Sequence, residues 1–189
     1  MGKTIGVLAL QGDYFKHAVA AQKVGAQTVE VREKADLGKV DGLIIPGGES
    51  GVMSKLLVRD GLLEPLKKFA ATGKPIFGTC AGAILLSADI ERYEQTSLGL
   101  LDIQVKRNGY GRQIESFETT LTVPVLGDNP VWAVFIRAPV ITRVGEGVEV
   151  MATHKGVPVL VRQGSVMAAT FHPELTEDSR VHEYFLAQV

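Results

Sequence analysis

The chain contains a single cysteine, and its neighbours are those of a reactive thiol. It stands in Gly78-Thr79-Cys80-Ala81-Gly82, with a strand-like run, KPIFGT, before it and a helix-like run, AGAILL, after it. This is the pattern of a nucleophile elbow with cysteine in place of serine. The glycines on either side relieve crowding at a strained turn. The N-terminus of the following helix would favour the reactive thiolate, and its N–H groups could stabilise an oxyanion.

A glycine-rich loop could supply a second oxyanion donor. Pro46-Gly47-Gly48-Glu49-Ser50 follows the apolar run GLII. In elbow folds the second donor comes from a loop after a neighbouring strand. Paired glycines leave the backbone N–H groups open to a substrate. The phosphate-binding patterns G-K-[ST] and G-x-G-x-x-G do not occur in this loop.

One histidine is placed to act as the base for this cysteine. His172 ends the apolar run SVMAATF, and catalytic groups in α/β folds cluster at such strand ends. A residue before proline favours extended backbone, in which alternate side chains point the same way. His172 and Glu174 can therefore lie side by side, so that the carboxylate orients the imidazole and stabilises the imidazolium formed when Cys80 loses its proton.

The other three histidines give weaker signals. His17 and His182 fall in expected helices among polar neighbours, and we expect both on the solvated surface. His154 stands at a strand-to-turn boundary.

Each of these segments also has a purely structural interpretation. A lone cysteine is commonly a small buried apolar side chain. Pro-Gly-Gly is commonly an ordinary turn. His-Pro-Glu is commonly a loop histidine beside a capping or solvated glutamate. Their joint occurrence is what favours a Cys80–His172–Glu174 triad.

The elements expected around these residues indicate the fold. In the first half, the strand-like runs TIGVLAL, QTVEV, DGLII and KPIFGTC alternate with helices expected from Asp13 to about Val24, near 51–58 and 61–72, and at AGAILLSA. This alternation predicts a mostly parallel sheet. After Leu100, seven short strand-like runs precede a final helix, EDSRVHEYFLAQ, and suggest hairpins added to the sheet. We expect one domain, residues 1–189, with a three-layer α/β/α sandwich and antiparallel additions.

Composition narrows the class of protein. The formal net charge is −1 and no long basic run occurs, so nothing favours nucleic acid or a membrane as a partner. The apolar run Ile5–Leu10 is too short for a signal-peptide core, and no window approaches the ~20 apolar residues of a membrane span. One cysteine and scattered histidines form no ligand cluster, so we expect no metal and no cofactor. We expect a cytoplasmic protein.

The three chemical segments and several longer ones carry a family resemblance. The chain resembles the class I, triad-type glutamine amidotransferases, and within them the glutaminase subunits of pyridoxal 5′-phosphate synthase. The resemblance covers nearly the whole chain, in GVLALQGD, IIPGGES, FGTCAGAILL, LGLLDIQVKRNGYGRQIESFE, VFIRAP and FHPELTEDSRVHEYF. The elbow and H-P-E mark the superfamily, whereas RNGYGRQ and FIRAP single out the subfamily.

The resemblance implies a function and a set of site residues. It implies hydrolysis of L-glutamine to L-glutamate and ammonia by the triad, and transfer of ammonia to a partner synthase (lyase) subunit in a heteromeric complex. It implies a glutamine pocket formed by Gly47, Gly48, Glu49, Arg107, Ile136 and Arg137. An arginine suits the α-carboxylate of glutamine, although a surface ion pair is the ordinary use of either arginine. Gln11, Gly48 and Ala81 are expected at the oxyanion site, with Gln11 also near the synthase interface.

The chain departs from the family pattern at two points, and two other functions stay open. Gly51-Val52 replaces the usual Thr-Thr after the glycine-rich loop, and Ala83 replaces a larger apolar residue. One alternative is another enzyme of the superfamily, such as the glutaminase of histidine or purine synthesis or a γ-glutamyl peptidase. The other is a catalytically inactive regulatory or scaffold subunit.

Overall fold

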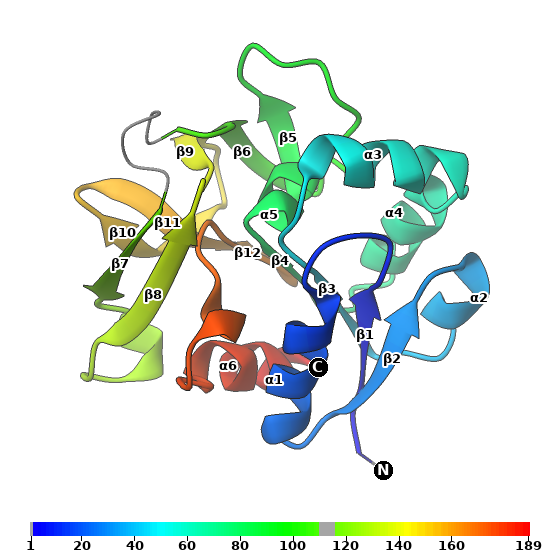
Figure 1. The fold of residues 1–189 in the computed structure, drawn as a ribbon, viewed down its shortest axis with the longest axis horizontal. Coiled ribbons are helices and arrows are strands. Elements are labelled where there is room, and N and C mark those ends of the chain that lie inside the picture. The colour runs from blue at the N-terminus through cyan, green and yellow to red at the C-terminus, as the bar shows by residue number, and fades with distance from the viewer. Residues whose placement is uncertain (1, 110–115) are drawn as a thin grey trace.

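The computed structural model describes residues 2–109 and 116–189 (Figure 1). A seven-stranded sheet forms its centre, in the order β10-β11-β12-β4-β3-β1-β2. The five strands from β12 to β2 run parallel, and β10 and β11 extend one edge as an antiparallel pair. The bounds are β1 Thr4–Leu8, β2 Gln27–Val31, β3 Gly42–Ile45, β4 Ile76–Thr79, β10 Glu149–His154, β11 Val157–Gln163 and β12 Val166–Ala169.

Helices cover both faces of this sheet, which confirms the predicted three layers. One face packs against α2 (Lys34–Leu37), α3 (Ser50–Arg59), α4 (Leu63–Ala71) and α5 (Ala81–Leu86), and the other against α1 (Tyr14–Lys23) and α6 (Arg180–Gln188). Successive residues of a strand point to opposite faces. Ile44 accordingly packs beneath α1 and α6, while Ile45 packs on the other side. This two-sided burial is why β1, β3, β4 and β12 have nearly continuous apolar sequences, whereas the edge strand β2 does not.

The strands after residue 86 differ in part from the prediction. Of these strands, β10, β11 and β12 belong to the central sheet, where β11 pairs antiparallel with both of its neighbours. The others form a three-stranded sheet, β5-β6-β9, and a two-stranded sheet, β7-β8. Their bounds are β5 Ser87–Ile90, β6 Leu101–Lys106, β7 Ser116–Leu121, β8 Val131–Ile136 and β9 Val140–Val144. Strand-like sequences identify strands but not the distant strands with which they pair.

The strand β5 and the α-helix α2 were not predicted. The helix expected through AGAILLSA ends at Leu86, and the next four residues form β5 in parallel with β6. The four-residue helix α2 is too short to show a periodic pattern. Its first turn is stabilised by a reciprocal capping box between Glu33 and Asp36. No helix in residues 2–109 or 116–189 is long and apolar enough to cross a membrane.

Candidate active site

Cys80 stands at a strained turn between β4 and α5. Its backbone has φ 49° and ψ −104°, a combination that residues with a Cβ rarely adopt. The N–H of Cys80 donates to the carbonyl of Ala169 at 2.8 Å, which anchors the turn to the end of β12. Strain of this kind persists only where the surrounding structure holds it, and it is concentrated at functional sites.

The two glycines flanking this turn are required by packing. A Cβ on Gly78 would lie 2.5 Å from Cδ1 of Leu86 and 2.7 Å from the carbonyl carbon of Gly82. A Cβ on Gly82 would overlap the carbonyl oxygen of Ile45. The pattern G-x-C-x-G thus follows from the contact of α5 with β3 and β4.

His172 and Glu174 lie together behind the cysteine. His172 Nδ1 is 2.7 Å from Glu174 Oε1, and both side chains are buried. The local backbone differs from the extended chain that the sequence predicts, because Pro173 begins a short 3-10 helix, η2 (Pro173–Leu175). The turn brings the carboxylate back to the ring. Nδ1 is thereby occupied, and Cys80 is the second group whose interaction with the ring raises the pKa of His172.

The charges in this trio stabilise one another. Burial lowers the pKa of His172, but hydrogen bonds and charge interactions with Cys80 and Glu174 outweigh burial and raise it to about 10. Burial raises the pKa of Glu174, but His17 and His172 outweigh it, and the net direction is downward. At neutral pH, His172 is therefore an imidazolium between a carboxylate and the cysteine sulfur.

Two loops meet beside the sulfur. Gln11 Oε1 accepts a hydrogen bond of 2.8 Å from the N–H of Glu49, and the N–H of Asp13 donates to the carbonyl of Gly47 at 3.3 Å. A Cβ on Gly48 would lie 2.5 Å from Gln11 Oε1, and one on Gly47 would lie 2.5 Å from Cε1 of His172. The paired glycines therefore allow the loop after β3 to lie against both Gln11 and the histidine ring.

A charged pair forms the opposite wall. Glu49 caps α3 by accepting hydrogen bonds from the N–H groups of Gly51 (3.0 Å) and Val52 (2.9 Å). Its Oε1 also accepts from Arg107 Nη2 at 2.9 Å, and the Arg107 guanidinium lies 4.1 Å from the centre of the Tyr93 ring. Burial raises the pKa of Glu49, but the helix N–H groups and Arg107 lower it overall. The departure at residues 51 and 52 thus leaves the cap of α3 intact.

A cavity of about 430 Å³ joins these parts. It brings together every predicted site residue except Glu174, which lies behind His172: Gln11, Gly47, Gly48, Glu49, Cys80, Ala81, Arg107, Ile136, Arg137 and His172. The carbonyl of Ile136 lies 3.9 Å from Cys80 Sγ. Besides Cys80, two other lining residues have left-handed backbone, Asn108 with φ 49° and Arg137 with φ 42°.

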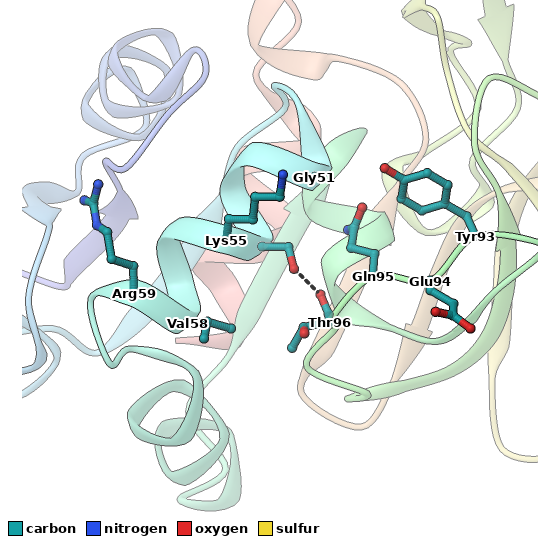
Figure 2. Close-up of a pocket in the computed structure, with 9 residues that line it drawn as sticks. Gly51, Lys55, Val58, Arg59, Tyr93, Glu94, Gln95 and Thr96 are labelled. Atoms are coloured by element: carbon teal, nitrogen blue, oxygen red, sulfur yellow. Dashed lines mark hydrogen bonds between the residues drawn. The ribbon is translucent and has the colours of Figure 1, made fainter.

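A second cavity, of about 450 Å³, lies between α3 and residues 93–96 (Figure 2). Ser54 Oγ donates to the carbonyl of Thr96 at 2.8 Å across it, which ties the loop to α3. This loop carries Tyr93, whose hydroxyl would lie 3.5 Å from a Cβ at position 51. The second cavity therefore adjoins the Arg107 wall, and a Cβ at position 51 would only reach van der Waals contact with the Tyr93 hydroxyl.

Several residues near the candidate site were not predicted from the sequence. Asn108 and Leu175 lie in the quoted segments RNGYGRQ and FHPELTEDSRVHEYF but were given no role, and only its contact with Arg107 reveals Tyr93. A tyrosine within an otherwise polar segment was the sole signal for Tyr93. The part of RNGYGRQ from residue 110 to 113 lies outside the described residues.

The prediction that His17 and His182 are solvated is wrong. Both side chains are buried, on facing sides of α1 and α6. Their sequence neighbours are polar because the outer faces of these helices are exposed. His154, by contrast, ends β10 and stacks on Phe117 at 5.3 Å between ring centres. No group of three or more potential metal-ligating side chains was found among the described residues.

Comparison with known proteins identifies relatives of the whole chain. The model of the SNO glutamine amidotransferase family matches residues 7–189. Pyridoxal 5′-phosphate synthase subunit PdxT of Desulforudis audaxviator is 55% identical over 182 residues, covering 96% of each chain. The same subunit of Thermotoga maritima is 50% identical over 185 residues, covering 98% of each chain.

A solved structure gives the same result. A crystal structure of a glutamine amidotransferase is 50% identical to the chain, covers 97% of each chain and superposes with a TM-score of 0.93.

Proposed function

The chain belongs to the SNO glutamine amidotransferase family, and we propose that it hydrolyses L-glutamine to L-glutamate and ammonia for the synthesis of pyridoxal 5′-phosphate. The observation that carries the proposal is that His172 is hydrogen-bonded to Glu174 and lines a substrate-sized cavity together with Cys80. Relatives at 50–55% identity that are named as a subunit of pyridoxal 5′-phosphate synthase support the destination of the ammonia.

The first half of the reaction forms a thioester. The Cys80 thiolate attacks the side-chain amide carbon of glutamine, and the amide oxygen becomes an oxyanion. Ala81 begins α5, so its N–H is one of the helix N–H groups without an intrahelical acceptor, and with the N–H of Gly48 it holds this oxyanion. His172 then donates its proton to the departing nitrogen, and ammonia leaves.

The second half releases glutamate. His172, now neutral, takes a proton from water as the water attacks the thioester carbonyl. Collapse of this intermediate breaks the carbon–sulfur bond and returns Cys80 to the thiolate and His172 to the imidazolium. Glu174 keeps the ring oriented throughout and stabilises its charged form.

The charged wall suits the other end of glutamine. The Arg107 guanidinium offers planar N–H donors to the α-carboxylate, and the carboxylate of Glu49 faces the same cavity and suits the α-ammonium. Gly47, Gly48, Ile136 and Arg137 complete the pocket, and Gln11 fixes the loop that carries Gly48.

The partner in this proposal is the synthase subunit that uses the ammonia, joined to the chain in a heteromeric complex. The whole chain, residues 1–189, acts as one glutaminase domain in the cytoplasm. Cell fractionation with an antibody against the chain tests the location, and recovery in the membrane or outside the cell would contradict it.

The decisive experiment is a glutaminase assay of the wild type and of Cys80→Ala, each with and without the synthase subunit. We expect glutamate release by the wild type in the complex and a loss of at least about 10³-fold in Cys80→Ala. Labelling of Cys80 by an electrophilic glutamine analogue provides an independent check. Retained activity in Cys80→Ala, or no activity and no labelling in the wild-type complex, would reject the proposal.

A further inference from the structure

Behind the triad lies a second buried group of polar side chains that the mechanism above does not use. His17, on α1, is fully buried and lies between Glu174 and His182 of α6. Its Nε2 is 3.3 Å from Glu174 Oε2 and 2.9 Å from Thr79 Oγ1, and its Nδ1 is 3.1 Å from His182 Nε2. Figure 1 shows α1 and α6 side by side, with η2 next to them.

The surroundings favour neutral rings in this group. Burial lowers the pKa of His17 and the positive charge of His172 lowers it further, and these effects outweigh the opposing influence of Glu174 and Asp13. Burial and the neighbouring His17 lower the pKa of His182 to about 3. Phe77 packs its ring nearly perpendicular to both imidazoles, which keeps water from them on that side.

The donor and the acceptor in each hydrogen bond then follow from which atoms can carry a proton. The Glu174 carboxylate oxygen 3.3 Å away favours the tautomer of the neutral His17 ring with its proton on Nε2, and this N–H donates to Thr79 Oγ1 at 2.9 Å. His17 Nδ1 is consequently an acceptor, and His182 Nε2 donates to it. His182 Nδ1 is left as a bare acceptor, in agreement with its lack of a partner among the described residues.

The carboxylate of Glu174 is hydrogen-bonded at one oxygen only, because the buried Oε2 has no hydrogen-bond partner among the described residues. His172 Nδ1 holds Oε1 at 2.7 Å, and His17 Nε2 lies beside Oε2. A buried carboxylate with only one of its oxygens held could rotate about its terminal torsion, which is soft. Thr79 directly precedes Cys80, so its contact with His17 also links α1 to the elbow.

We propose that His17 is a positioning residue of the proposed glutaminase, whose Nε2–H, hydrogen-bonded to Thr79 and 3.3 Å from Glu174 Oε2, restrains the Glu174 carboxylate electrostatically and through it the orientation of His172 towards Cys80. The inference rests on the proposed function for its kinetic consequence, but the geometry it claims can be measured without turnover.

Two substitutions of His17 with similar size and polarity distinguish a positioning role from a role in filling the buried space. The side-chain amide of His17→Gln reaches the place of Nε2 and can place an N–H beside Glu174. The side-chain amide of His17→Asn reaches only the place of Nδ1, towards His182. His182→Asn is the matched control on the other side of the pair, because it disturbs the same buried cluster without removing the N–H beside Glu174.

The first measurement is turnover by the complex with the synthase subunit. We expect kcat to fall about 10–100-fold in His17→Asn with KM changed less than about threefold, and to stay within about fivefold of the wild type in His17→Gln. His182→Asn should lower kcat less than about threefold. Equal losses in all three variants, or a loss in His17→Gln as large as in His17→Asn, would overturn the proposal.

The second measurement is the proton resonance of His172 Nδ1–H, observed by NMR in the free chain. We expect a strongly hydrogen-bonded signal in the wild type and in His17→Gln, and its weakening or loss in His17→Asn. An unchanged signal in His17→Asn would overturn the proposal whatever the kinetics. If Cys80→Ala fails to abolish activity but the signal behaves as expected, the proposed reaction is rejected and the positioning by His17 stands.

Discussion

On one wall of the 430 Å³ cavity, Cys80 and His172 are almost wholly buried, and backbone strain, close-packed glycines and a buried carboxylate hold them. On the facing wall, the Glu49 side chain is 51% exposed and Arg107 is 23% exposed, and an ion pair and a stacked tyrosine hold them. The proposed reacting groups are thus fixed by the core of the fold. The proposed substrate-binding groups are fixed by surface contacts, which are individually weak and easily rearranged.

This difference in burial suggests that the two walls have different roles. Groups that transfer a proton must keep their geometry within a fraction of an ångström. Groups that clamp a charged substrate can adjust as it enters, and an exposed wall is also where a partner subunit can act. Changes to the buried wall should therefore alter kcat or folding, and changes to the exposed wall should alter KM.

The largest expected effect comes from His172→Ala. Removing the proton carrier should lower kcat by about 10³–10⁴-fold while KM for glutamine changes less than about threefold. Steady-state kinetics of the complex measure both. A main effect on KM would contradict the assignment of His172 to the reacting wall.

Gly82→Ala tests the packing of that wall. The new Cβ would overlap the carbonyl oxygen of Ile45, so we expect a loss of about 3 kcal/mol in the free energy of unfolding. Urea denaturation measures it. Gly38→Ala is the control, because Gly38 has helical backbone and its nearest neighbour, the carbonyl oxygen of Ala35, lies 3.5 Å from the added Cβ. Similar losses in both variants would show that the contact between α5 and β3 is not the cause.

Arg107→Lys tests the exposed wall. Lysine keeps the charge but loses the planar pair of donors, so KM should rise about 10-fold, about 1.4 kcal/mol, with kcat nearly unchanged. Arg143→Lys is the control, because Arg143 forms an exposed ion pair with Asp102 and does not line the cavity. A loss of kcat with unchanged KM would place Arg107 with the reacting groups.

The smallest expected effect is a change in the pKa of His172 that NMR can follow. The pKa of His172, raised to about 10 by Cys80 and Glu174 against burial, should fall towards 6.5 in Cys80→Ala, because one of the two negative partners is removed. Since the folded value lies above 6.5, the stabilisation by this ring is complete below pH 6.5 and is lost as the pH rises through about 10. NMR titration of the histidine rings checks it, and a wild-type ring that loses its proton below pH 7 would contradict the ion pair.

The two walls differ in how much of their structure could be predicted from the sequence. The elbow pattern, the Pro-Gly-Gly loop and His-Pro-Glu are local signals, and the structure places their side chains around one cavity. His172 and Glu174 lie together as predicted, but a 3-10 turn, and not the extended chain that the sequence predicted, brings them together. Tyr93 was missed, because its contact with Arg107 joins segments that no motif connects.

The sequence by itself determined which residues could be chemically reactive, the alternation of strands and helices, and the class of fold, because these depend on local spacing, turn chemistry and the period of apolar residues. Only the tertiary structure decided that β5-β6-β9 and β7-β8 stand apart from the central sheet. Only the tertiary structure also showed that two histidines with polar sequence neighbours are buried behind Glu174. The physical reason is the same in both cases: a strand's partners and a side chain's burial depend on residues far away along the chain.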